Sequence, residues 1–251
     1  MSRNIALIGG DSQVGTTMTA QALAEDLGAK GDQVLLVMAS GKAGDDFFVN
    51  KEGKSIDDIK ANLINGHMDS YELRQALIRD KNIWILPGVK DSISAAYYNE
   101  RSMKPLAAAS ENMDHVIFDC GNELRLGLVI SAVDLCAERY FVLTQQEKTL
   151  RRFGDMKERI LDPLDFSGKI IVNKHQSNVS LLTPGEISRQ FSMDVAASIP
   201  YVEYGWQAEI ERQTLMGTGR YSKAIGNLSD IIKGERTENS SWIKNLILKN
   251  T

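Results

Sequence analysis

The residues best suited to chemistry follow the first apolar run of the chain, between Gly9 and Met18. This segment reads GGDSQVGTTM and leads into a stretch whose apolar residues recur at helical spacing. Glycines let a backbone approach a ligand closely, and the N–H groups at a helix N-terminus bind anions. The pattern therefore predicts a loop that cradles phosphate groups. The loop has one chemical peculiarity, because no lysine occurs between Arg3 and Lys30.

The histidines and cysteines form no pattern typical of catalysis or metal binding. His67, His115 and His175 are scattered along the chain, and none is spaced with a Ser or Cys nucleophile. This placement favours packing or solvent exposure for all three. Cys120 and Cys136 lie in or beside apolar runs, where free cysteines pack as small hydrophobic residues. We therefore expect two buried thiols in a reducing compartment.

The composition describes an ordinary globular protein that can bury a sizeable core. The 251 residues are 43% hydrophobic and 25% charged, and the net charge is -4. This charge argues against nucleic acid as a partner, because affinity for a phosphate backbone comes from Lys and Arg. The sequence shows no secretory signal and no apolar run approaching 18 residues, so we expect a cytosolic protein. One modest basic cluster, typical of a solvated helix face, comprises Lys148, Arg151, Arg152, Lys157 and Arg159.

Short apolar runs alternate with helical patterns along most of the chain, and these elements must position the loop. Helical spacing occurs at 16–31 and at 147–161. Strands that are apolar throughout and separated by helices indicate a mostly parallel sheet with helices on both faces, a three-layer, doubly wound α/β fold. Such sheets bind ligands at the carboxyl ends of their strands. The predicted strands are 4–9, 33–39, 82–88, 114–121, 139–145, 168–174 and 195–200.

The last residues differ in character from the rest of the chain. We expect one domain over residues 1–233, a polar linker over 234–241 and a short amphipathic helix over 242–251. A helix with an apolar face, a Trp at its edge and Lys opposite suits a membrane interface, but it also suits docking onto the domain itself or onto a second subunit. Both alternatives stay open. The residues of the apolar face are Trp242, Ile243, Leu246 and Ile247.

The ordered set of motifs resembles the MinD/ParA family of P-loop ATPases. The loop after the first strand is similar to the family's deviant Walker A loop, and 113–121 is similar to its Walker B segment. The stretch 55–88 follows the family's pattern of two helices and a strand that ends in Leu-Pro-Gly, and 170–174 and 197–217 match later family motifs. The resemblance covers about residues 3–233 and implies a P-loop NTPase-like fold. Its degenerate members include the TadZ/CpaE-like proteins.

The resemblance implies roles for single residues. Thr17 matches the hydroxyl that ligates Mg²⁺, Asp119 matches the Walker B carboxylate, and Asn173 matches the residue that reads adenine. The family's two loop lysines fall on Asp11 and Thr16, and its catalytic pair of aspartates falls on Met38 and Ser40. The nucleotide-binding residues that it implies are Gly10, Asp11, Ser12, Gln13, Val14, Gly15, Thr16, Thr17, Met18, Asn173 and Pro200.

These losses bear on hydrolysis more than on binding. Backbone N–H groups could still hold ATP or ADP with Mg²⁺, but phosphoryl transfer needs positioned charge that this loop lacks. We assign no catalytic residue and do not expect an enzyme. Three interpretations remain: a spatial regulator or localisation factor with little or no hydrolysis, a nucleotide-free pseudo-ATPase scaffold for a partner complex, and, third, a ParA-like DNA-partitioning ATPase. The resemblance also implies a homodimer, an unidentified protein partner and a cytoplasmic location that could extend to the inner face of the cell membrane.

Overall fold

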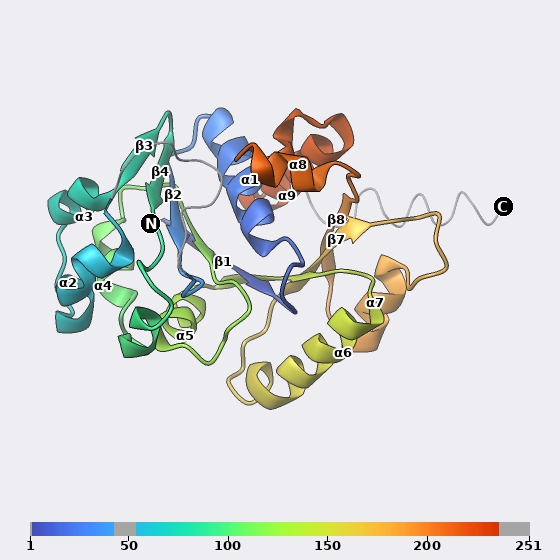
Figure 1. Cartoon of the computed structure of the whole chain (residues 1–251), viewed down its shortest axis with the longest axis horizontal. Coiled ribbons are helices and arrows are strands. Elements are labelled where there is room, and N and C mark those ends of the chain that lie inside the picture. The colour runs from blue at the N-terminus through green and yellow to red at the C-terminus, as the bar shows by residue number, and fades with distance from the viewer. Residues whose placement is uncertain (1, 43–53, 236–251) are drawn as a thin grey trace.

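A computed structural model describes residues 2–42 and 54–235 (Figure 1). The strands are β1 (Arg3–Gly9), β2 (Val34–Met38), β3 (Ile78–Asp80), β4 (Ile83–Leu86), β5 (His115–Asp119), β6 (Glu138–Leu143), β7 (Lys169–His175) and β8 (Val195–Pro200). They form one sheet in the order β3-β4-β2-β5-β1-β6-β7-β8. Within the described residues every pairing is parallel except that of β3 with β4. The prediction of a mostly parallel sheet is therefore confirmed.

Helices cover both faces of this sheet, as Figure 1 shows. The helices are α1 (Thr16–Ala29), α2 (Lys60–Asn65), α3 (Ser70–Ala76), α4 (Lys104–Ala109), α5 (Gly127–Asp134), α6 (Glu147–Met156), α7 (Pro184–Phe191), α8 (Gly205–Ile210) and α9 (Gly219–Lys233). Shorter turns lie at Ile56–Ile59, Ser94–Tyr97 and Leu215–Gly217, and a π-helical turn covers Lys157–Leu161.

Alternation of side chains along the central strand divides the core into two halves. In β1, Ile5 and Leu7 pack in one hydrophobic cluster with α1 and α9, whereas Ala6 and Ile8 pack in another with α2 to α7. Successive residues of a strand point to opposite faces, so a strand buried on both faces must be apolar throughout. The three-layer, doubly wound prediction is confirmed.

The apolar runs predicted the positions of most strands. They missed one edge strand, and one predicted helix ends early. Each of the seven predicted runs overlaps one strand of the sheet, and the bounds differ by a few residues. The edge strand β3 was missed, because three residues are too short for a periodic pattern. The predicted helix over 147–161 ends as α6 at Met156 and continues as a π-helical turn.

The order of the strands brings three strand ends to one place. Leu7 of β1 and Met38 of β2 both pair with Asp119 of β5. The chain leaves β1 toward β2, returns to place β5 between them, and then adds β6 on the other side of β1. Ligands of open α/β sheets bind where the strand order reverses in this way. The carboxyl end of β1 is thus the place to look for a site.

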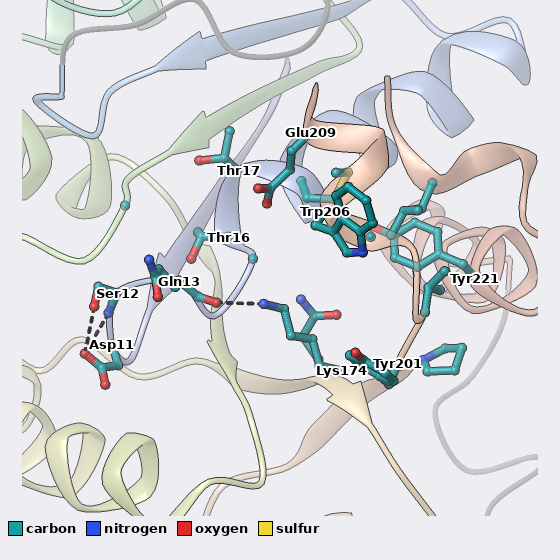
Figure 2. A pocket seen from close by; sticks show the side chains of 18 of the residues that line it. Asp11, Ser12, Gln13, Thr16, Thr17, Lys174, Tyr201, Trp206, Glu209 and Tyr221 are labelled. Atoms are coloured by element: carbon teal, nitrogen blue, oxygen red, sulfur yellow. Dashed lines mark hydrogen bonds between the residues drawn. The ribbon is translucent and has the colours of Figure 1, made fainter. Parts of the chain in front are cut away.

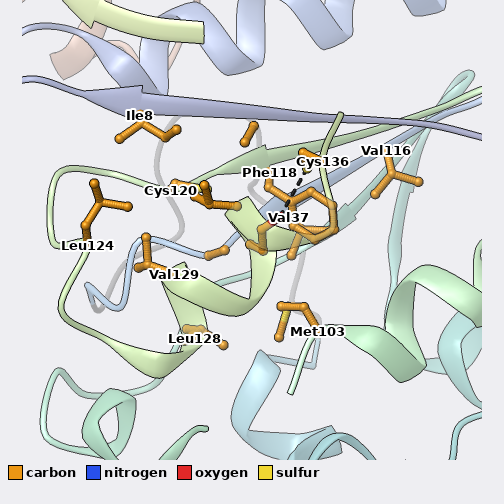
Figure 3. Packing of buried hydrophobic residues seen from close by; sticks show 14 of the residues in the cluster. Ile8, Val37, Met103, Val116, Phe118, Cys120, Leu124, Leu128, Val129 and Cys136 are labelled. Carbon is orange, nitrogen blue, oxygen red and sulfur yellow. Dashed lines mark hydrogen bonds between the residues drawn. The ribbon is translucent and has the colours of Figure 1, made fainter. Parts of the chain in front are cut away.

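The two cysteines are free and buried, as predicted. Cys120 follows β5 among apolar neighbours, and the Cys136 thiol donates a hydrogen bond to the Ala132 carbonyl over 3.1 Å (Figure 3). Burial raises the pKa of both thiols. Neither is therefore a reactive thiolate at neutral pH.

The chain beyond residue 235 lies outside the described residues. This applies to most of the predicted linker and to the predicted amphipathic helix with Trp242, Ile243, Leu246 and Ile247. None of the helices in the described ranges combines the length and apolar character that crossing a bilayer requires.

Candidate functional site

A cavity of about 630 Å³ opens at the carboxyl edge of the sheet, beside the loop that follows β1 (Figure 2). Nine of the eleven predicted nucleotide-binding residues line it. They are Asp11, Ser12, Gln13, Gly15, Thr16, Thr17, Met18, Asn173 and Pro200. The structure thus brings residues of β7 and β8 to the same cavity as the loop.

The other two predicted residues, Gly10 and Val14, lie behind the loop and give it shape. The Gly10 N–H donates to the Val142 carbonyl over 3.0 Å. A Cβ atom on Gly10 would come within 2.3 Å of the Leu143 side chain. Val14 is buried in the core against α1. Both residues are structural rather than part of the cavity wall.

The end of β7 braces the loop from the opposite side. The Asn173 side-chain nitrogen donates to the Val14 carbonyl over 2.8 Å. The Lys174 ammonium donates to the Gln13 carbonyl over 2.9 Å (Figure 2). Gly15 has a φ of +88°, and a Cβ atom there would lie 2.4 Å from the Asn173 amide nitrogen. Hydrogen bonds from β7 therefore hold the carbonyl groups of the loop in place.

Helix α1 begins at this loop with an open N-terminus. Gly15 is its N-cap, and within the described structure no side chain caps the helix and no acidic residue lies in its first turn. Thr16, Thr17 and Met18 form that first turn and line the cavity. Unsatisfied N–H groups and the helix dipole favour an anion at this position. The cavity is therefore suited to phosphate groups.

Thr17 and Asp119, predicted to lie at a Mg²⁺ ion, are in contact. The Thr17 hydroxyl donates to Asp119 Oδ2 over 2.6 Å, and the Gly121 N–H donates to Oδ1 over 3.2 Å. Asp119 is fully buried, whereas Thr17 lines the cavity. Because the hydroxyl proton points at Asp119, the oxygen lone pairs are left for a cation. Mg²⁺ prefers oxygen ligands and keeps several waters, so the pair fits an ion held by Thr17 and oriented by Asp119.

Asp11 faces two cations from α6. Its carboxylate forms an ion pair with the Arg152 guanidinium, lies 3.8 Å from the Lys148 ammonium, and accepts the Ser12 N–H over 2.7 Å. Burial would raise the pKa of Asp11, but these hydrogen bonds and the charges of Arg152 and Lys148 outweigh it and hold the pKa below its usual range. The acid on the loop is thus ionised and compensated within the chain.

The basic cluster, which lies on α6 and the π-helical turn that follows it, is therefore more than a solvated face. Arg152 and Lys148 pair with the loop, whereas Arg151 pairs with Glu147 and Lys157 pairs with Asp162. The sequence interpretation missed the first two contacts, because 141 positions separate Asp11 from Arg152.

The end of β2 has no acid where the resemblance places a catalytic pair. Met38 and Ser40 are both buried there.

The cavity also has charged and aromatic residues that the sequence interpretation did not select. Lys174 could have been found from the sequence, because it directly follows Asn173 and ligands bind at the carboxyl ends of strands. The remaining residues have no sequence pattern that marks them. They include Lys42, Lys174, Tyr201, Trp206, Glu209 and Arg212.

None of the three histidines is among the residues that line the cavity, although His175 directly follows Lys174 on β7. His115 is buried at the start of β5, at the opposite edge of the sheet, with its Nε2 atom 3.4 Å from Asp32. Burial lowers the pKa of His115 and of His175. In the described ranges, no three His, Cys, Asp or Glu residues gather as a metal-binding group.

Solved structures similar to this chain exist, whereas comparisons of its sequence find no match. No protein-family model matches the chain, and no curated protein matches its sequence. Among solved structures, the MinD cell division protein of Aquifex aeolicus has a TM-score of 0.75 at 18% identity over 94% of this chain and 98% of its own. This chain has the MinD/ParA fold.

Two further structures agree with this assignment. A ParA family ATPase from Chlorobium tepidum has a TM-score of 0.75 at 19% identity, over 91% of this chain and 98% of its own. The septum site-determining protein MinD of Pyrococcus horikoshii, complexed with Mg-ADP, has a TM-score of 0.69 at 17% identity, over 92% and 96%. At such identities the likeness shows the shared MinD/ParA fold, and it confirms the P-loop NTPase-like expectation.

Proposed function

We propose that this chain is a degenerate MinD/ParA-like spatial regulator that binds ATP or ADP with Mg²⁺ and hydrolyses little or none of it. One observation carries the proposal. The open N-terminus of α1 and the Thr17–Asp119 pair face the cavity side of a loop that lacks lysine. Such an arrangement can bind the phosphate groups of a nucleotide. It lacks the loop lysine that would promote hydrolysis.

Binding is supported by the size and lining of the cavity. Its volume lies within the range of small-molecule sites, about 300–1,000 Å³. The α1 N-terminus offers N–H groups to phosphates, and Tyr201 and Trp206 supply aromatic surface at the wall. The charge of Asp11 does not forbid an anion, because Arg152 and Lys148 offset it. A bound Mg²⁺ ion would neutralise phosphate charge beside Thr17.

Weak or absent hydrolysis is supported by the acidic residue on the loop and by the residues at the end of β2. Phosphoryl transfer is accelerated by cations and positioned groups that stabilise charge building on the transferring phosphoryl group. The loop supplies an acid where the resemblance expects a lysine, and β2 ends in Met38 and Ser40. No described residue at the end of β2 can therefore act as the expected carboxylate.

Calorimetric titration with ATP and with ADP, with and without Mg²⁺, tests the proposal. We expect heat of binding that Mg²⁺ increases, and no release of phosphate over hours. Thr17→Val should abolish the Mg²⁺ effect, because the isosteric side chain lacks the hydroxyl oxygen, whereas Thr17→Ser should keep it. Rapid phosphate release by the wild type would contradict the regulator. Light scattering of the same samples tests the proposed homodimer, which should appear with ATP.

A nucleotide-free scaffold is the second candidate, and the bracing of the loop favours it. Asn173 and Lys174 hold two carbonyl groups of the loop through hydrogen bonds made within the protein itself. Absence of heat with either nucleotide would leave this scaffold, with a protein partner as its ligand. DNA partitioning has the least support, because ion pairs occupy Arg151, Arg152 and Lys157 of the basic cluster.

Contact with the inner face of the membrane through residues 242–251 is part of the regulator proposal. An amphipathic segment of this length binds marginally unless dimerisation doubles it. We expect the full chain to co-sediment with anionic liposomes in ATP. Replacing Trp242 and Leu246 with glutamate should release it, whereas Lys244→Arg should not. Equal sedimentation of all three proteins would show that the segment does not contact lipid.

A further inference from the structure

The cavity holds a cation that does not belong to the loop. We propose that Lys42, in the turn after β2, binds the phosphates of the nucleotide and supplies the positive charge that the loop has lost. This inference rests on the proposed function and adds to it a residue and a ligand class, the di- and triphosphates.

Two interlocked turns place Lys42 at the cavity wall. Gly41 and Gly121 have φ values of +71° and +55°, a region that favours glycine. A Cβ atom on Gly41 would lie 2.5 Å from the Leu126 side chain, and one on Gly121 would lie 2.8 Å from the Cβ of Ser40. Neither turn tolerates a side chain at its bend. The residues that follow the two glycines, Lys42 and Asn122, both line the cavity.

The ammonium of Lys42 has a neutral hydrogen-bond partner. It donates to Asn122 Oδ1 over 3.2 Å, and this partner is a neutral amide. Of the residues that the structure describes, no carboxylate lies within ion-pair distance of it. Lys174, another cation of the wall, donates instead to the Gln13 carbonyl and braces the loop. Lys42 is therefore the better placed of the two lysines to meet an anion.

A short chain of contacts puts Lys42 on the phosphate side of the cavity. Thr17 donates to Asp119, which accepts the Gly121 N–H, and Asn122 follows Gly121 and holds Lys42. Thr17 belongs to the first turn of α1, where phosphates would meet free N–H groups. An ammonium on this side strengthens phosphate binding through charge-assisted hydrogen bonds. The nucleoside would lie farther away and gain nothing from it.

Calorimetry of the full chain and of variants with ATP, ADP and adenosine tests the assignment. Lys42→Ala should weaken ATP binding by about tenfold, the usual value of one charge-assisted contact, and ADP somewhat less. Adenosine binding should not change. Lys42→Arg should retain most of the affinity, and the exposed Lys104→Ala on α4 is the matched control. Thermal melting checks that each variant is folded.

The outcomes separate this inference from the proposed function. Equal binding of ATP by Lys42→Ala and wild type would overturn the role of Lys42 and leave the proposed function intact. An equal loss for ATP and adenosine would also overturn it, because the lysine would then act on the nucleoside or on the fold. Absence of binding by the wild type would overturn both.

Discussion

Replacing Asp11 with asparagine is expected to tighten ATP binding by about tenfold, and replacing Arg152 with glutamine is expected to weaken it by a similar factor. The loop acid and the α6 cations now neutralise one another at the cavity. Asp11→Asn leaves Arg152 and Lys148 free to attract phosphate. Arg152→Gln leaves a nearly buried carboxylate at the cavity, and Lys148, 3.8 Å away, remains as its paired cation. The two changes should therefore act in opposite directions.

The neighbouring arginine provides the control for this experiment. Arg151 lies on the same helix but pairs with Glu147, so Arg151→Gln should leave ATP affinity unchanged. Titrations at low and moderate salt should show the largest differences at low salt, because exposed charges are screened. Changes of the same sign in Asp11→Asn and Arg152→Gln would refute the mutual neutralisation.

The second large effect is expected at Gly15. Alanine there must adopt a φ of +88°, and its Cβ atom would lie 2.4 Å from the Asn173 amide nitrogen. The amide would have to leave the Val14 carbonyl, to which it now donates inside the protein. Strain and the lost buried hydrogen bond together should lower the free energy of unfolding by about 3 kcal/mol. Nucleotide binding should be lost, since Gly15 is the N-cap of α1 and directly precedes its first turn.

Gly31 separates strain from contact. It has a φ of +98°, but a Cβ atom there would meet nothing within 4 Å. Gly31→Ala should therefore cost only the backbone strain, about 1 kcal/mol, and leave nucleotide binding intact. Urea unfolding of the two variants measures the difference. Equal losses of stability would mean that Asn173 does not restrain the loop.

The sequence predicted the fold because the fold depends on burial. Strands such as β1 and β5 are covered on both faces, so their residues must be apolar and the run is visible without any structure. The three residues of β3 at the sheet edge bury too little to leave such a mark. The Thr17–Asp119 contact was also predictable, because the resemblance gave both residues a common ion.

The charge balance of the site could not be predicted in the same way. The contact between Asp11 and Arg152 depends on where α6 lies against the loop, and helical spacing carries no information about that position. Lys42 stands after a strand end but lacks any pattern until Asn122 is seen beside it. Long-range ion pairs are made by exposed or half-buried side chains, whose identity the hydrophobic pattern leaves free.

The pairing of Asp11 with α6 also bears on how the loop could change in evolution. A single change of Asp11 to lysine would place a third cation against Arg152 and Lys148, and like charges at this distance repel. A lysine at position 11 therefore requires a compensating change on α6. Helix α6 thus restricts which charge the loop can carry at this position.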